Sequence, residues 1–124
     1  MNNERETIVD FVAKGESPDE WRLVLVEQGP WSGSIEDELR RLQERLYGCV
    51  DAALDGKLAT QFPESAGKRI VVQVDCYNLP RDVITDFFNR FSSGVFELAD
   101  YRDALHKSEY VQDISFDLTF DAIH

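Results

Sequence analysis

The 124-residue sequence contains little of the residue types on which many catalytic and metal sites depend, with two histidines, two cysteines and one methionine. It also lacks any apolar run that approaches the ~18 residues of a membrane-spanning helix. Basic residues are scarce, since 24 acids stand against 13 bases and give a net charge of −11. These shortages argue against a nucleic-acid or membrane partner and favour a basic protein partner.

The few histidines and cysteines stand at positions that predict no chemistry. His106 lies in a polar stretch and His124 is the last residue, and neither has an acid or thiol at metal-ligand or triad spacing. Cys49 and Cys76 fall in an expected helix and an expected strand, so we expect buried free thiols, as is normal in the cytoplasm. The polar start of the chain lacks a signal-peptide core, which also favours a cytoplasmic protein. We expect no catalytic residue, no metal and no cofactor.

The negative charge is concentrated at the two ends of the chain. Residues 1–38 carry a net charge of −7, residues 39–90 carry +1 and residues 91–124 carry −5. A field of this sign speeds the approach of a basic partner, although acidity also serves solubility alone. The charge pattern leaves both interpretations open.

The segment from Ser34 to Asp55 is the strongest predicted helix. Its apolar residues recur with the helical period of 3.6 and form one stripe: Ile35, Leu39, Leu42, Leu46, Cys49, Val50, Ala53 and Leu54. Ser34 and Asp37 resemble a capping box with a shorter acid. Gly56 follows at the position where a glycine commonly ends a helix.

The remaining pattern predicts four strands and a second helix. The strands are expected at residues 7–13, 21–27, 69–77 and 113–121, and the helix runs from 80 to about 92. The first two strands form a predicted hairpin around the turn at residues 14–20. Residues 57–68 are expected to be a loop, and residues 95–110 fit either a short helix or a loop.

The order β-β-α-β-α-(α)-β predicts an α+β fold. We expect a two-layer sandwich with a mostly antiparallel sheet and helices packed on one face, because alternation in the last two strands indicates one wet face. The length suits a single domain over residues 1–124, in which residues 91–124 form an acidic C-terminal extension.

Several segments resemble a family of small uncharacterised bacterial domains. The matching residues are Val9-Asp10-Phe11, Leu23-Val24-Leu25-Val26, Trp31, Glu38 to Leu46, Gly56-Lys57-Leu58, Pro63, the strand from Arg69, and Pro80. The resemblance covers roughly residues 8–90 and implies a fold with almost no chemistry, because the family is known as a domain of unknown function. Residues 91–124 are longer and more acidic than the family pattern, so a specialised partner surface is expected in this tail.

The segment from Phe96 to Asp103 interleaves aromatic and acidic residues, as tight protein interfaces do. The predicted contact residues are Glu97, Asp100, Tyr101, Asp103 and Tyr110. The alternative is an ordinary amphipathic segment that packs Phe96, Leu98 and Tyr101 inward.

Asp75 and Asp117 are a second candidate pair. If their strands are neighbours, both carboxylates lie on the exposed face of the sheet and form an acidic patch. The alternative is a solvated face without a partner. The recurrence of Asp113, Asp117 and Asp121 is too widely spaced along a strand to hold one metal ion.

These features predict a non-enzymatic protein-binding module. The most concrete hypothesis is a bacterial immunity protein that neutralises a basic toxin domain, such as a nuclease, by direct binding. One alternative is a housekeeping or regulatory domain that forms a homodimer through the open sheet face. A third is a carboxylate-based enzyme that uses Asp75. The sequence leaves the oligomeric state and the identity of the partner undetermined.

Overall fold

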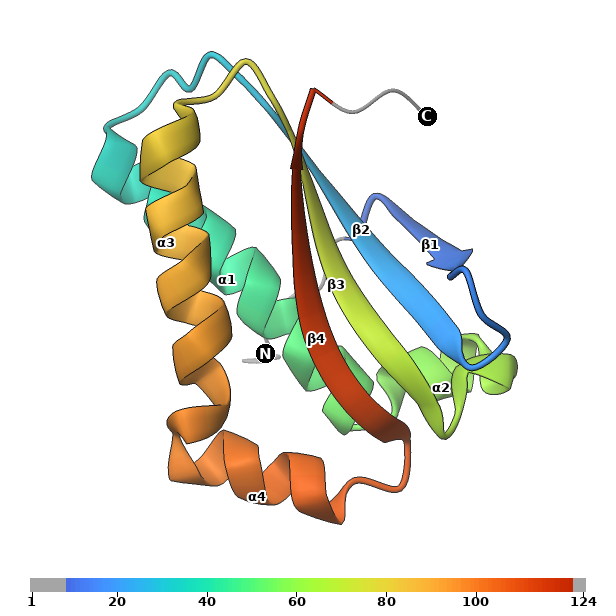
Figure 1. The fold of residues 1–124 in the computed structure, drawn as a ribbon. Coiled ribbons are helices and arrows are strands. Elements are labelled where there is room, and N and C mark those ends of the chain that lie inside the picture. The colour runs from blue at the N-terminus through green and yellow to red at the C-terminus, as the bar shows by residue number, and fades with distance from the viewer. Residues whose placement is uncertain (1–8, 122–124) are drawn as a thin grey trace, which may run out of the picture.

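A four-stranded sheet organises the chain in the computed structural model, which describes residues 9–121 (Figure 1). The strands are β1 (Phe11–Lys14), β2 (Glu20–Gln28), β3 (Lys68–Tyr77) and β4 (Val111–Phe120). The helices are α1 (Ile35–Leu54), α2 (Lys57–Gln61), α3 (Arg81–Gly94) and α4 (Ala99–Lys107), with 3₁₀ turns at Pro63–Ser65 and Val95–Glu97. The spatial order is β1-β2-β3-β4, so β1 and β4 form the two edges.

The direction of the strands corrects one prediction. Only β1 and β2 pair antiparallel, as the predicted hairpin requires, whereas β2–β3 and β3–β4 pair in parallel. The expectation of a mostly antiparallel sheet is therefore wrong. Each later connection contains helices that return the chain to the end of the sheet where the previous strand began, and such crossovers join parallel strands. Alternating polarity reports which face is covered and carries no information on strand direction.

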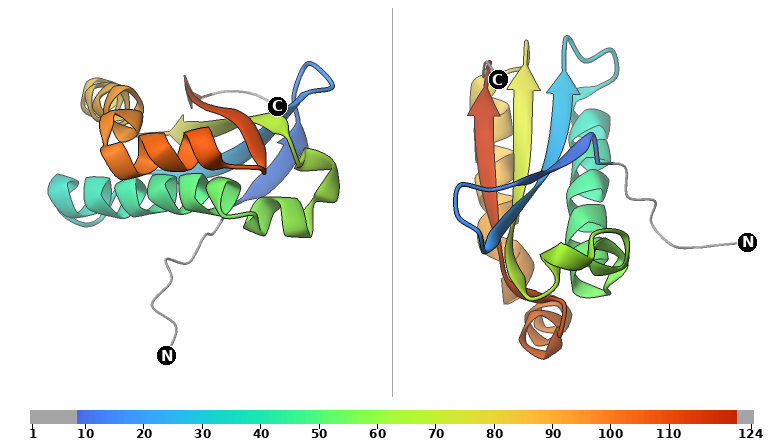
Figure 2. Two further views of the ribbon diagram at one scale, coloured as in Figure 1. Left: turned by 90° about the horizontal axis from the view of Figure 1, so that it is seen from below. Right: turned by 90° about the vertical axis from the view of Figure 1, so that its right-hand side faces the viewer.

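The helices lie on one face of the sheet, as predicted, where α1 and α3 cover it (Figure 2). Between the two layers lies a continuous apolar core. Its fully buried members include Leu23, Leu25, Leu42, Leu46, Ile70, Val72, Val74 and Ile84. The apolar residues of the last strand, from Ile114 to Phe120, pack against the same core, which confirms the predicted inward set.

Local signals set the ends of α1. The Ser34 side chain accepts the Asp37 N–H at 3.2 Å, which confirms the predicted N-terminal cap. Gly56 has a φ of +92°, a left-handed conformation that glycine adopts without a steric penalty. The helix therefore begins and ends within one residue of the predicted bounds.

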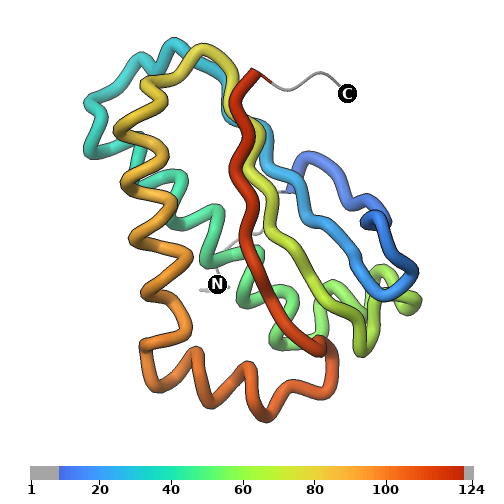
Figure 3. The backbone as a smooth tube through the Cα atoms, viewed as in Figure 1, coloured from blue at the N-terminus to red at the C-terminus, as the bar shows by residue number. Residues whose placement is uncertain are grey.

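One connecting segment differs from its prediction, and a second adopts one of the two structures predicted for it. The expected loop at residues 57–68 contains helix α2 and a 3₁₀ turn, and Leu58 buries its side chain in the core. Residues 95–110 contain helix α4, which Figure 3 shows crossing from the end of α3 to the start of β4. No residue of α4 is fully buried. Its apolar pattern in the sequence is correspondingly weak, so the pattern alone did not distinguish a helix from a loop.

The first strand is shorter than predicted. Residues 7 and 8 of the expected strand lie outside the described residues, and β1 begins only at Phe11. The Asp10 carboxylate, rather than a backbone carbonyl, accepts the Val26 N–H at 2.6 Å. Both cysteines are free and buried, as expected. Within residues 9–121, no helix is long and apolar enough to cross a membrane.

Candidate protein-binding surfaces

Helix α4 and its flanking residues carry a set of acids without internal partners. We call Glu97, Leu98, Asp100, Asp103 and Glu109 the α4 surface; all five are exposed. The four acidic side chains have no ion-pair or hydrogen-bond partner among residues 9–121. Leu98 adds an apolar side chain that is 49% exposed. The α4 surface thus combines charge with apolar area, which protein interfaces use.

Most arginines of the described chain are paired with acids, although the exposed acids Glu16, Glu36, Asp82 and Asp113 also have no ion-pair partner among residues 9–121. Seven of the eight arginines between residues 9 and 121 pair with an acid. The exception is Arg102, which lies on α4 itself. Because Asp100 and Asp103 stand three positions apart on the helix, their charges repel one another. A cation from outside the chain would relieve this repulsion.

The two predicted tyrosine contacts have internal roles. The Tyr101 hydroxyl donates to Asp51 Oδ1 at 2.8 Å, and its ring centroid lies 5.4 Å from that of Tyr47 on α1. These contacts hold α4 beside the C-terminal half of α1, as Figure 2 shows. Tyr110 keeps 40% of its surface exposed, while its ring packs over Gly56. Of the two rings, Tyr110 offers more surface to a partner.

Asp75 and Asp117 lie on the same face of the sheet but form no open acidic patch. Their strands are neighbours, and Asp75 stands opposite Thr119 while Asp117 stands opposite Gln73. Asp75 is only 1% exposed, so the prediction of an exposed carboxylate is wrong. Its Oδ1 accepts hydrogen bonds from Gln73 Nε2 at 2.8 Å and Thr119 Oγ1 at 2.7 Å.

Arg22 neutralises the other carboxylate of this pair. Its Nη1 donates to Asp117 Oδ2 at 3.0 Å and to Gln73 Oε1 at 2.7 Å, and its Nε donates to Glu20 Oε2 at 3.0 Å. Burial lowers the pKa of Arg22, but the hydrogen bonds to Asp117 and Glu20 outweigh burial and raise it. Arg22 and Asp117 are 95 positions apart in the chain, so only the strand order brings them together.

The structure places no metal-binding cluster beside these acids. Among residues 9–121, no group of three or more histidines, cysteines, aspartates or glutamates is arranged to hold a metal ion. His106 is exposed on α4, and His124 lies outside the described residues. A hollow of about 520 Å³ lies at the start of β2 and is lined by Lys14, Pro18, Trp21, Glu64 and Lys68, none of which is a predicted contact residue.

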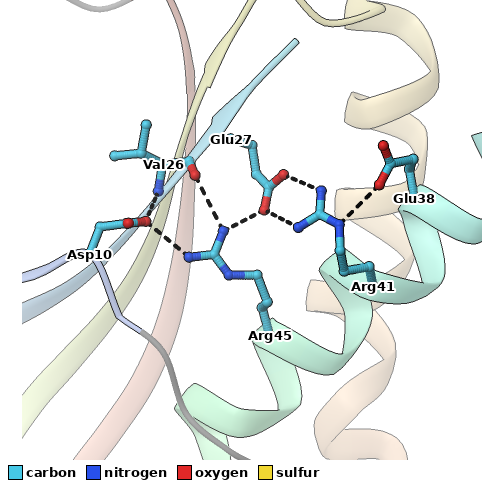
Figure 4. A network of polar contacts seen from close by, with 6 residues as sticks. All are labelled: Asp10, Val26, Glu27, Glu38, Arg41 and Arg45. Carbon is cyan, nitrogen blue, oxygen red and sulfur yellow. Dashed lines mark hydrogen bonds and ion pairs between the residues drawn. The ribbon is translucent and has the colours of Figure 1, made fainter. Parts of the chain in front are cut away.

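The sequence interpretation missed a buried charge network around Glu27 (Figure 4). Glu27 ends the apolar run of β2 and is 3% exposed. Arg41 donates to both of its carboxylate oxygens, at 2.6 and 3.1 Å, and Arg45 donates to one of them. Glu38 accepts from Arg41 at 2.9 Å, and Asp10 accepts from Arg45 at 2.9 Å. A signal was present, because two arginines four positions apart on one helix face suit a single carboxylate.

The network joins β2 to α1 and determines the charge of Glu27. Burial raises the pKa of the Glu27 carboxyl, but hydrogen bonds from Arg41 and Arg45 outweigh burial and hold that pKa below its ordinary value. The carboxylate stays ionised and is occupied by two guanidinium groups. Its role is to fix the helix on the sheet.

Comparison of the chain with protein-family models, with curated proteins and with solved structures gave no match. The resemblance to a family of small bacterial domains therefore stays a prediction, and the assignment of function depends on the surfaces described above.

Proposed function

We propose that this chain is a non-enzymatic protein-binding module that recognises a basic partner through the α4 surface. Its most concrete form is a cytoplasmic bacterial immunity protein that neutralises a toxin domain, such as a nuclease, by direct binding. The observation that carries the proposal is the group of exposed acids Glu97, Asp100, Asp103 and Glu109, which have no cationic partner within residues 9–121.

Electrostatic steering gives this surface a kinetic role. A field of one sign raises the association rate of an oppositely charged partner by roughly one to three orders of magnitude, and salt screens it. The apolar contribution comes from Leu98, 49% exposed, and Tyr110, 40% exposed. Charge then sets the rate of encounter, and the apolar side chains slow dissociation.

The test uses the product of the gene adjacent to that of this chain as the partner. Co-expression should relieve any toxicity of that product, and the two proteins should co-purify. We expect the double charge reversal Asp100→Lys and Asp103→Lys to slow association at low salt and to weaken its salt dependence. Stopped-flow measurement of the association rate over a salt series provides the readout.

A matched control separates the α4 surface from net charge. The double reversal Glu16→Lys and Glu36→Lys changes the net charge equally, at two exposed acids in the β1–β2 turn and in the first turn of α1. It should slow association less than the α4 reversal does. Equal effects of the two variants, or an association rate without salt dependence, would contradict the proposal.

A further inference from the structure

The outer edge of β4 presents backbone groups that find no neighbouring strand among residues 9–121. The N–H of Asp121 donates to the Cys76 carbonyl at 2.8 Å, so the odd-numbered residues at this end of the chain direct their backbone toward β3. Alternate residues of a strand direct these groups to opposite sides. Ile114, Phe116 and Phe120 therefore direct theirs outward, where no strand of residues 9–121 lies.

This edge is long, and its protection is limited to the acids Asp113 and Asp117 and a register shift at its start. It runs for 10 residues, whereas β1 at the opposite edge has 4. Proteins commonly protect edges with lysine, proline or a bulge. The sequence of β4 contains neither lysine nor proline, and the register shift at Lys68/Arg69 lies at its very start. Among residues 9–121, the outward N–H of Leu118 does have a partner, because Asp117 Oδ1 accepts it at 3.0 Å.

The side chains of β4 are also incompletely covered. Phe116, Leu118 and Phe120 are half-buried on the helix side, whereas Val72 and Val74 in the neighbouring strand are 0% exposed. On the other face, Asp113 is exposed and has no ion-pair partner among residues 9–121. A further strand beside β4 would extend the apolar layer on the helix side. On the other face, the side chains of that strand would lie next to the acids of β4.

We propose that β4 accepts an added strand from an extended segment of the basic partner, in which apolar and basic side chains alternate. The apolar side chains extend the row of Phe116 and Leu118, and the basic ones face Asp113 and the half-buried Asp117, which already pairs with Arg22, so Asp113 is the main contact. A second copy of β4 fits less well, because the strand carries acids and no base, and self-pairing sets like charges side by side. The inference deepens the proposed function and rests on it for the charge of the partner.

The probe is a capped ten-residue peptide of alternating lysine and valine, matched to the 10 residues of β4. Amide hydrogen exchange by NMR is measured with and without the peptide. At a free concentration about ten times Kd, exchange at Ile114, Phe116 and Phe120 should slow about tenfold. The odd-numbered amides, which already face β3, should change little. Simple electrostatic adsorption would leave the outward amides unchanged and would overturn the proposal.

Two controls test charge and backbone separately. A peptide with glutamate in place of lysine, and one N-methylated at every amide so that both of its edges are blocked, should each fail to protect the outward amides. Asp113→Lys should weaken binding of the lysine peptide, whereas Glu16→Lys, with the same change in net charge, should weaken it less. If these amides become more protected as the protein concentration rises, without any peptide, the edge binds a second copy of this chain instead.

The peptide experiment tests β4 independently of the α4 surface. Asp100→Lys with Asp103→Lys should retain most of the amide protection by the peptide. A peptide that fails to protect the outward amides overturns strand addition, even if α4 reversal still slows association with the whole partner. An unchanged association rate in the α4 variant, with amide protection intact, contradicts the α4 proposal alone.

Discussion

The carboxylate of Glu27 and the guanidinium of Arg41 meet in a two-pronged pair, with Oε1 2.6 Å from Nη2 and Oε2 3.1 Å from Nη1. The pair joins the end of β2 to the second turn of α1. Arg45, one turn further along the helix, binds the same carboxylate. These buried charge contacts therefore hold α1 on the sheet, and none of them involves a residue of the α4 surface.

Removing the charge of Glu27 should destabilise the fold. Glu27→Gln leaves two arginines facing a neutral amide. Removing one partner of a buried ion pair lowers the free energy of unfolding by about 3 kcal/mol. The value stays at the lower end of the known range because the Arg41 side chain is 44% exposed and regains water. Urea unfolding at neutral pH measures it. The control Arg40→Gln removes an exposed pair with Asp37 and should cost less than about 0.5 kcal/mol; equal losses would contradict the prediction.

The same carboxylate predicts a dependence of stability on acid. Because the folded pKa of Glu27 lies below its ordinary value of 4.5, its contribution is fully present above that value and is lost as pH falls through the folded pKa. The free energy of unfolding should therefore fall less steeply below about pH 4.5 in Glu27→Gln than in the wild type. Urea titrations at a series of acidic pH values measure both slopes, and identical slopes would count against this role.

Two glycines should respond to alanine with opposite signs. At Gly56, φ is +92° and an added Cβ would lie 2.8 Å from the Tyr110 ring, so Gly56→Ala should destabilise the fold by about 1–2 kcal/mol. At Gly94, in the last turn of α3, nothing lies within 4 Å of an added Cβ. Gly94→Ala should stabilise by about 0.5–1 kcal/mol because alanine favours the helix. Thermal unfolding of both variants tests the difference in sign.

The hydroxyl of Tyr101 should matter for stability rather than for binding. Tyr101→Phe removes the hydrogen bond to Asp51 and should lower the free energy of unfolding by about 1 kcal/mol. The ring packing against Tyr47 remains, so the association rate with the partner should stay near that of the wild type. A variant with unchanged stability and slower association would place the hydroxyl in the interface instead.

Both thiols should be unreactive in the folded protein. Burial raises the pKa of Cys49 to about 12, and burial together with nearby acids raises the pKa of Cys76 to about 12, so almost no thiolate forms at neutral pH. A colorimetric thiol reagent should detect no fast reaction in buffer and two thiols per chain in denaturant. Fast labelling of either cysteine in the native protein would mean that its element opens readily.

Short-range patterns predicted most elements of the fold, and long-range contacts account for the corrections. The 3.6-residue period, the Ser34 cap and Gly56 located α1, because these signals act within a few residues. The strand directions and the burial of Asp75 depend on which strands become neighbours, which no local window contains. For the same reason, neither Arg22 beside Asp117 nor the two arginines around Glu27 were anticipated.

The sequence by itself determined the excess of acid, the acidic tail, the scarcity of histidine and cysteine, and the alternation that faces Ile114 to Phe120 inward. These properties belong to single residues or to their immediate neighbours. Only the tertiary structure decided which acids stay without a cation. Asp117 acquires Arg22 from β2, whereas Asp100 and Asp103 project from a helix that no arginine of another element reaches. Packing brings charges together across the chain, so the unpaired remainder, and with it the proposed binding surface, emerges only when the fold is complete.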